Sequence, residues 1–199
     1  MFLDSELPSS DRIGVFMRIW ICISLYLLFA LSQLALAQEG SSMLTLTSPS
    51  FAAGQAMPKK YSCEDGERSP PLAWSGVPAG TKSLALIMDD PDAPDPKAPQ
   101  RTWVHWVLYN IPPTTTSIAE SSSSGALPPG TVEGQNDFKR VRYGGPCPPI
   151  GRHRYFHKLY ALDITLPSGP PLTKSALEAA MKGHILAQAE LIGTYQKGD

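Results

Sequence analysis

The fold class that the sequence predicts is mainly β: two packed sheets, with one short helix near the C-terminus. Apolar or alternating runs recur along the chain, and such runs are typical of strands. Proline and glycine, 20 and 16 of the 199 residues, gather between these runs, where they favour turns. A single helical pattern occurs late in the chain. Because a sheet buries its apolar face against another layer, a two-sheet sandwich is expected.

Each expected strand is an apolar or alternating run that ends at turn residues. The run at 83–88, Ser-Leu-Ala-Leu-Ile-Met, is almost wholly apolar, which predicts a central strand covered on both faces. The run at 103–111 is dominated by aromatic and β-branched residues, which favour strands. The expected strands are 43–51, 72–74, 83–88, 103–111, a short one at 138–143, 156–166 and a closing one at 185–195.

The expected helix begins after Thr173, a good N-cap residue, and ends near Gly183, a plausible C-cap. The segment at 185–195 is ambiguous, since its first half favours a helix and its second half a strand. We expect a strand there, because Gly183 ends the helix. The segment at 114–134 is rich in Thr, Ser, Gly and Pro and is interpreted as a long surface connection.

Residues 1–37 are interpreted as a secretory signal peptide. A polar start that carries Arg12 and Arg18 precedes an apolar run at 19–36, and an Ala-Leu-Ala site that ends at Ala37 follows it. Cleavage there leaves one domain, residues 38–199, in the periplasm or outside the cell. An uncleaved anchor is the alternative, because the run is about long enough to span a bilayer. Membrane contact is expected only through such a retained segment.

Charge and cysteine content narrow the class of partner. Removing residues 1–37 takes two arginines and three acidic residues from 17 basic and 18 acidic ones, so 15 of each remain. A neutral domain without a basic block gives no reason to expect nucleic acid. The remaining cysteines are Cys63 and Cys147. In an exported chain a pair favours one disulfide, and two free thiols are the alternative.

A loop rich in proline and glycine, residues 144–151, is followed by His153, Arg154 and Tyr155. Proline fixes φ and lacks an N–H, and glycine allows positive φ, so neither a helix nor a central strand is expected here. A stiff loop loses little entropy when it grips a ligand. The alternative is a turn that only separates two strands.

Titratable side chains lie at the ends of several expected strands. Two carboxylates follow the buried strand, one histidine lies inside the next strand, and a second histidine and a tyrosine follow the loop. A cationic imidazole beside a carboxylate can donate both N–H groups to an anion, and a tyrosine O–H can add a third donor. The alternatives are an Asp-Pro-Asp turn and a histidine packed in the core. The candidate ligand-binding residues are Asp90, Asp92, His105, His153 and Tyr155.

Three motifs occur in order: Asp90-Pro91-Asp92-Ala93-Pro94, His105-Trp106, and Gly145-Pro146-x-Pro-Pro-x-Gly-x-His153-Arg154-Tyr155. Their order, spacing and context resemble the phosphatidylethanolamine-binding protein family, in particular its bacterial Raf-kinase-inhibitor-like branch. The resemblance extends over residues 44–195. It implies a sandwich of a large and a small β-sheet, with a small anion-binding cavity at one end. It also implies binding of phosphate or phospholipid head groups.

The resemblance assigns pocket positions to individual residues. Asp90, His105, His153 and Tyr155 fall on the family's pocket residues, and Asp92, Gly145 and Pro146 are expected to line the pocket. Cys147 lies in the same loop, so a disulfide to Cys63 would tether the loop to the segment before Pro70.

These observations favour an exported, non-enzymatic protein that binds a small anion or phosphorylated head group and so modulates a protein target. The first alternative is an inhibitor of a hydrolase or kinase that acts through protein contact, for example through residues 114–134. The second is an enzyme, since His and carboxylate side chains suit Zn²⁺. Against catalysis, a Gly-x-Ser-x-Gly nucleophile elbow is absent from the sequence. We expect no catalytic residue, metal or cofactor.

Overall fold

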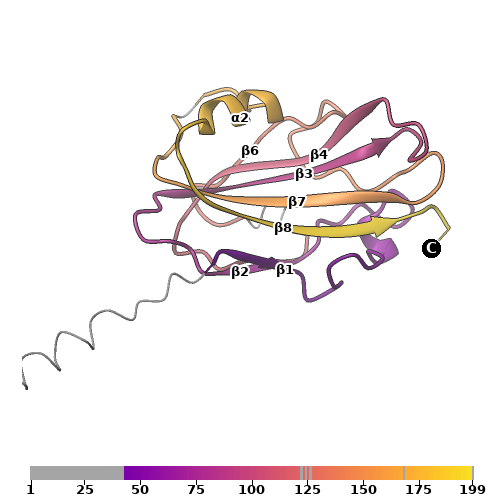
Figure 1. Cartoon of the computed structure of the whole chain (residues 1–199), viewed down its shortest axis with the longest axis horizontal. Coiled ribbons are helices and arrows are strands. Elements are labelled where there is room, and N and C mark those ends of the chain that lie inside the picture. The colour runs from indigo at the N-terminus through magenta and orange to yellow at the C-terminus, as the bar shows by residue number, and fades with distance from the viewer. Residues whose placement is uncertain (1–42, 122, 124, 126, 168, 199) are drawn as a thin grey trace, which may run out of the picture. The chain divides into compact units, whose positions relative to one another are not determined.

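The computed structural model describes residues 43–198, except 122, 124, 126 and 168, and the expected signal peptide lies outside these residues. The described chain forms two antiparallel sheets and one α-helix, which confirms the mainly β fold class. Figure 1 shows the five-stranded sheet between two layers, with β1 and β2 on one side and α2 on the other. Within the described residues, no helix has the length and hydrophobicity that a membrane crossing requires.

The large sheet has the strand order β6-β4-β3-β7-β8, and each neighbouring pair is antiparallel. Its central strand β3 is buried along nearly its whole length, as its apolar sequence predicts. The strands, in sheet order, are β6 (Val132–Glu133), β4 (Arg101–Ile111), β3 (Ser83–Ala93), β7 (His153–Leu162) and β8 (Ile185–Tyr195).

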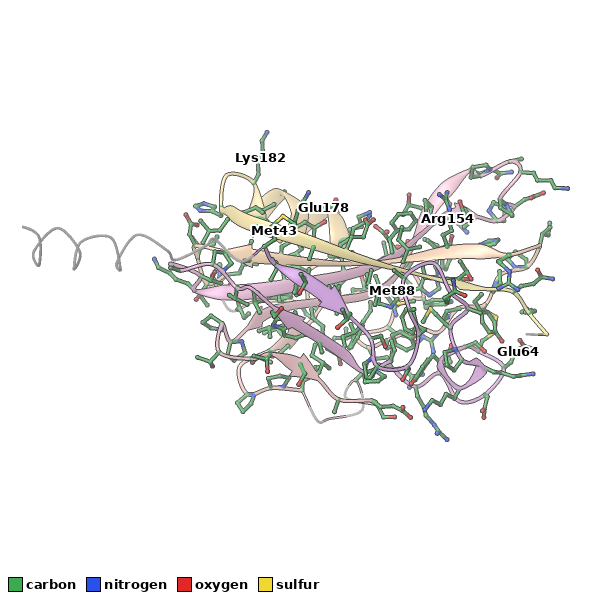
Figure 2. All side chains as sticks on the ribbon, turned by 60° about the horizontal axis from the view of Figure 1, so that its bottom comes forward. Met43, Glu64, Met88, Arg154, Glu178 and Lys182 are labelled. Carbon is green, nitrogen blue, oxygen red and sulfur yellow. A yellow bond between two sulfur atoms is a disulfide. The ribbon has the colours of Figure 1, made fainter. Side chains whose placement is uncertain are left out.

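The small sheet has the order β1-β2-β5, with β1 at Thr45–Thr47, β2 at Leu72–Ser75 and β5 at Ser117–Ile118. The main apolar core includes side chains from both sheets, among them Trp74 and Met88. Figure 2 shows Met88 inside the molecule, whereas Lys182 points away from it.

The other face of the large sheet is covered by α2 (Lys174–Met181), which adds Leu177 and Met181 to a second apolar cluster. The Thr173 hydroxyl accepts a hydrogen bond from the Ala176 N–H at 3.3 Å, so the predicted N-cap is confirmed. Gly183, with φ of 84°, follows the helix in the left-handed conformation that a helix end favours.

The expected strand at 138–143 is wrong. Asn136 is buried, and its side-chain oxygen accepts a hydrogen bond from the Arg140 N–H at 3.0 Å. Its amide group donates to the carbonyls of His105 and Arg142. These bonds, with Lys139 in a left-handed conformation, hold the segment as a turn beside β4.

Several boundaries also differ from the expectation. The segment at 114–134 contains two short strands, β5 and β6, which pair with β2 and β4. A short 3₁₀ helix, η1 (Lys59–Tyr61), was not expected. β7 begins at His153 rather than at 156, so the histidine and tyrosine after the loop are strand residues.

The two central strands of the large sheet separate at one end. β3 pairs with β7 as far as Asp89, which lies opposite Phe156. Beyond this point β3 continues beside β4 alone, with register shifts on either side of Asp90. Pro91 is tolerated in this part of β3, because a residue without an N–H disturbs no second ladder. The separation leaves Tyr155 without a partner on β3 and opens space between the strands.

Candidate ligand-binding site

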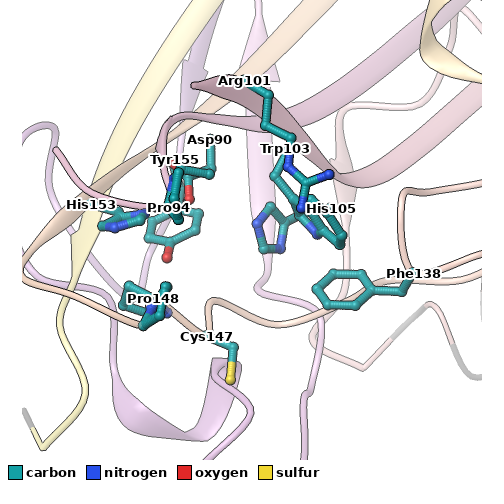
Figure 3. Close-up of a pocket in the computed structure, with 12 residues that line it drawn as sticks. Asp90, Pro94, Arg101, Trp103, His105, Phe138, Cys147, Pro148, His153 and Tyr155 are labelled. Carbon is teal, nitrogen blue, oxygen red and sulfur yellow. Dashed lines mark hydrogen bonds and ion pairs between the residues drawn. The ribbon is translucent and has the colours of Figure 1, made fainter. Parts of the chain in front are cut away.

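A cavity of about 190 Å³ lies where β3 and β7 separate. Its lining comes from β3, β4 and β7, from the loop at 144–151, and from Pro94 and Phe138 in two connecting segments (Figure 3). Asp90, His105, His153 and Tyr155 all contribute to it, so the structure brings together the four residues that were expected to form the pocket. The other lining residues are Ala93, Pro94, Arg101, Trp103, Phe138, Cys147, Pro148 and Pro149.

Asp90 and His153 form a buried pair at one side of the cavity. The Asp90 Oδ2 lies 2.7 Å from the His153 Nδ1, and Asp90 Oδ1 accepts a hydrogen bond from the Asp92 N–H. The second ring nitrogen of His153 lies 3.0 Å from the Ile150 carbonyl oxygen. Both ring nitrogens therefore have oxygen partners within the protein. His153 holds the loop and the carboxylate in place, and neither of its nitrogens is available to a ligand.

His105 presents one ring nitrogen to the cavity. Its Nδ1 donates to the Gly144 carbonyl oxygen at 2.7 Å, which leaves the Nε2 without a partner among the described residues. Burial is the main cause that lowers the pKa of His105 below its ordinary value of 6.5, while the Gly144 bond and Asp90 oppose this shift. At neutral pH the ring is therefore neutral, and its Nε2 is a hydrogen-bond acceptor.

The hydroxyl of Tyr155 has no hydrogen-bond partner among the described residues, although the side chain is fully buried. Figure 3 shows this hydroxyl directed into the space bounded by His105, Phe138 and Pro148. Burial raises the pKa of Tyr155 well above its ordinary value, so the group keeps its proton and can donate. A buried hydroxyl without a partner costs free energy, which makes this side chain the clearest sign of a ligand.

The mouth of the cavity contains groups that the sequence did not identify as site residues. The Arg101 guanidinium lies 4.2 Å from the centre of the Trp103 ring, and the Trp103 and Phe138 rings meet edge to face at 5.3 Å. Arg101 forms no ion pair with any described residue. Because alternate residues of a strand share a face, Arg101, Trp103 and His105 lie together, and this spacing could have identified the arginine.

Three residues that were expected to line the cavity lie outside its lining. Asp92 is held by Arg154, whose Nε and Nη2 donate to its two oxygens at 2.9 and 2.7 Å. This ion pair lowers the pKa of Asp92. At Gly145, a Cβ would come within 2.7 Å of the Tyr61 carbonyl oxygen. The Pro146 carbonyl accepts from the Cys63 N–H at 3.0 Å. All three shape the loop and the strand that carry the lining residues.

The two cysteines form a disulfide, with Cα atoms 5.5 Å apart. Cys147 lines the cavity, and Cys63 follows η1, so the bond joins the cavity loop to the segment before Pro70. The predicted tether is therefore present. Together with the backbone bond from Cys63 to Pro146, it fixes the floor of the cavity.

Within the described residues, no three His, Cys, Asp or Glu side chains are grouped so that they could hold a metal ion. His157, which follows His153 and Tyr155 on the same face of β7, lies in the core against Phe51 and does not line the cavity. The polar groups open to a ligand are thus a hydroxyl donor, an imidazole acceptor and a guanidinium. Such a set fits a small oxyanion that carries a proton.

Residues 47–196 match the family model described as phosphatidylethanolamine-binding protein. Two relatives, each named UPF0098 protein, are similar over most of their length. The one from Methanothermobacter thermautotrophicus is 50% identical over 143 residues, which are 71% of this chain and 91% of that protein. The one from Chlamydia muridarum is 45% identical over 154 residues, which are 77% of this chain and 99% of that protein.

Two crystal structures are also similar. One is described as a putative phosphatidylethanolamine-binding protein homologue, CT736, from Chlamydia trachomatis. It is 43% identical, has a TM-score of 0.72, and the match covers 79% of this chain and 99% of the other. The second is YbcL from E. coli, described as a new member of the mammalian family. It is 34% identical with a TM-score of 0.70, and the match covers 77% and 98% of the two chains.

Proposed function

This chain belongs to the phosphatidylethanolamine-binding protein family, and we propose that it binds a small oxyanion, such as phosphate or a phosphorylated head group, in the cavity beside Tyr155. The observation that carries the proposal is the fully buried Tyr155 hydroxyl, which has no partner among the described residues. A ligand oxygen at this hydroxyl would offset the cost of its burial. Binding of this kind would let the protein modulate a protein target, as the family resemblance implies.

The donor set favours an oxyanion that brings its own proton. Tyr155 donates, whereas neutral His105 offers only a lone pair at its Nε2. An oxyanion with an O–H group can accept from the tyrosine and donate to the histidine. An oxyanion without one requires His105 to be protonated, which its lowered pKa opposes. Inorganic phosphate keeps an O–H at neutral pH and sulfate does not, so the site should prefer phosphate.

Binding rather than catalysis is supported by the state of the candidate groups. The raised pKa of Tyr155 keeps the hydroxyl protonated, which makes it a donor and a poor nucleophile. Both ring nitrogens of His153 face acceptors within the protein. Among the described residues, the neutral His105 is hydrogen-bonded to the Gly144 carbonyl and to no hydroxyl or thiol nucleophile. A non-enzymatic role is the simplest function for this arrangement.

We further propose that the protein acts in the periplasm or outside the cell, after cleavage at Ala37. The arginines Arg12 and Arg18, the apolar run at 19–36 that follows them and the small residues after that run support export. The Cys63–Cys147 disulfide also supports it, because such bonds persist in oxidising compartments. Identification of the N-terminal residue of the protein purified from its native source would test this: Gln38 is expected, and Met1 would contradict cleavage.

The proposed ligand class is tested by calorimetric titration of the purified protein with phosphate and with sulfate. At about pH 8 phosphate should bind and sulfate should not, because neutral His105 needs a donor from the ligand. Sulfate affinity should then rise about tenfold per pH unit as the pH falls toward the lowered pKa of His105, since each unit makes the protonated fraction about tenfold larger.

Two histidine variants identify the group responsible. His105→Gln should abolish the pH dependence of sulfate binding, because an amide does not titrate in this range. His184→Gln is the matched control, since His184 lies outside the cavity lining and pairs with Asp163. Failure of both anions to bind at either pH would contradict the proposed function. An unchanged pH dependence in His105→Gln would contradict the role given to His105.

A further inference from the structure

Arg101 is the feature of the cavity that anion binding by Tyr155 and His105 leaves unexplained. Its guanidinium stacks on Trp103 at the cavity mouth and forms no ion pair with any described residue. Arginines elsewhere in the fold are used differently: Arg140 bonds Glu67 at 3.0 Å, and Arg154 bonds Asp92 at 2.7 Å. A stacked guanidinium without a carboxylate is positioned to meet the charge of a ligand.

The acidic groups at the cavity already have hydrogen-bond partners within the protein. Asp90 is the one carboxylate among the lining residues of the described chain, and it is paired with His153. Asp92 lies behind the lining and is paired with Arg154. A ligand that carries an ammonium group would therefore place it near the Arg101 guanidinium, with no unpaired carboxylate among the lining residues of the described chain.

The remaining wall of the cavity is apolar. Pro94, Pro148 and Pro149 line one part, and Trp103 and Phe138 line another. Surfaces of this kind favour an uncharged, apolar substituent, because its removal from water is favourable whereas an ammonium group would lose favourable hydration. The wall and the arginine together distinguish between two kinds of phosphate ester: those with an uncharged substituent and those with a cationic one.

We propose that Arg101 makes the cavity selective for phosphate monoesters with an uncharged substituent over zwitterionic ones such as phosphoethanolamine. This inference rests on the proposed function, since it concerns which oxyanion the same cavity accepts. Arg101 attracts the phosphoryl charge and repels an ammonium group a few bonds away. Two unit charges within about 5 Å at a partly exposed site interact strongly enough, after screening, to change affinity by about tenfold.

The test compares propyl phosphate with phosphoethanolamine, which differ only in a terminal methyl against a terminal ammonium group. At about pH 5, below the second pKa of about 6 of a phosphate ester, both ligands carry the same phosphoryl charge. In calorimetric titrations the protein should bind propyl phosphate about tenfold more tightly. Arg101→Gln should weaken the binding of propyl phosphate and bring the ratio of the two ligands' affinities close to one.

Lys97→Gln is the matched control. It removes one positive charge from the connection between β3 and β4, and Lys97 is exposed and outside the cavity lining. The ratio should stay unchanged in this variant, which excludes an effect of net charge alone. Arg101 is also exposed, so its replacement is expected to leave the fold intact.

The outcomes separate the two proposals. Binding of both ligands with equal affinity, or a ratio that survives Arg101→Gln, overturns the selectivity and leaves anion binding in place. If propyl phosphate, phosphoethanolamine and inorganic phosphate all fail to bind, the proposed function is overturned. Sedimentation with phosphatidylcholine vesicles containing phosphatidic acid identifies the source of the ester. Binding that requires Arg101 and is displaced by propyl phosphate supports a lipid source, and Arg101-dependent binding of propyl phosphate alone supports a soluble one.

Discussion

Asp89 and Asp90 are neighbours on β3, yet their carboxylates belong to opposite kinds of polar cluster. Asp89 is 1% exposed, and both of its oxygens accept hydrogen bonds from Lys158 at 2.9 Å, while Lys174 of α2 adds a third. Asp90 faces the cavity and bonds His153. Successive residues of a strand point to opposite faces, so one carboxylate turns toward α2 and the other toward the cavity.

The difference lies in what each cluster leaves without a partner. Around Asp89, the carboxylate and both ammonium groups are satisfied within the chain. Around Asp90, the Tyr155 hydroxyl, the His105 Nε2 and the Arg101 guanidinium remain without hydrogen-bond or ion-pair partners among the described residues. A buried polar cluster that is complete contributes to the fold. One that is incomplete costs stability, and we propose that a ligand completes the cluster around Asp90.

The largest expected effect on stability comes from removing the disulfide beside the incomplete cluster around Asp90, which we call the open cluster. Cys63 and Cys147 are separated by 84 positions, and closing a loop of that length stabilises the native state by about 4.5 kcal/mol in the chain-entropy account. Cys63→Ser with Cys147→Ser should lower the free energy of unfolding in urea by that order and weaken phosphate binding, because the cavity loop loses its tether. Unchanged stability would show that the backbone bond between Cys63 and Pro146 suffices.

His157 offers a third case, a core group with one ring nitrogen unsatisfied. Its Nδ1 donates to Leu191, its Nε2 has no partner among the described residues, and burial lowers its pKa to about 4. Between pH 6.5 and about 4 the unfolded chain holds a proton that the folded chain lacks. Stability therefore falls as the pH drops through this window, by about 3 kcal/mol.

Denaturation at several pH values checks this effect, with His157→Leu as the comparison. The variant should lack the part of the pH dependence that belongs to the histidine, while the carboxylates of the two proteins titrate alike. Parallel pH profiles for the two proteins would mean that His157 is protonated in the folded state as readily as in the unfolded state.

Asp89→Asn tests the complete cluster around Asp89, which we call the closed cluster. It leaves two ammonium groups without their carboxylate, and the expected loss is about 2 kcal/mol, less than for a wholly buried pair because both lysine side chains are partly exposed. Phosphate affinity should stay the same, since Asp89 does not line the cavity. A large loss of affinity without unfolding would show that the two clusters are coupled through β3.

The sequence carried enough to predict the sandwich, the late helix and four cavity residues. Apolar runs identified β3 and β4, and Asp90, His105, His153 and Tyr155 followed from motifs at strand ends. These features depend on local pattern or on the family resemblance. The disulfide was expected on grounds of compartment and is present.

What could not be predicted depends on partners that are distant in the chain. Asp92 resembled Asp90 in the motif, and only the fold shows that the Asp92 carboxylate forms an ion pair with Arg154. The segment at 138–143 had the pattern of a strand, but Asn136 forms the bonds that hold it as a turn. His157 is buried against Phe51, a residue far from it in the sequence.

Tyr155→Phe gives the smallest change in stability and the sharpest test of the open cluster. Removing a buried hydroxyl without a partner should raise the free energy of unfolding by about 1 kcal/mol. The same change removes a donor that the ligand requires. Tyr160→Phe is the matched control, because Tyr160 lies on the same strand and packs with the cluster beneath α2.

The measurement that most directly tests the central claim is phosphate affinity and urea stability in wild type and Tyr155→Phe. We predict opposite signs: the variant is more stable without ligand and binds phosphate at least about tenfold more weakly, a loss that corresponds to one hydrogen bond to a charged group. If Tyr155→Phe binds phosphate as tightly as wild type does, whether or not it is also less stable, the Tyr155 hydroxyl serves the fold and the cavity is not an anion site.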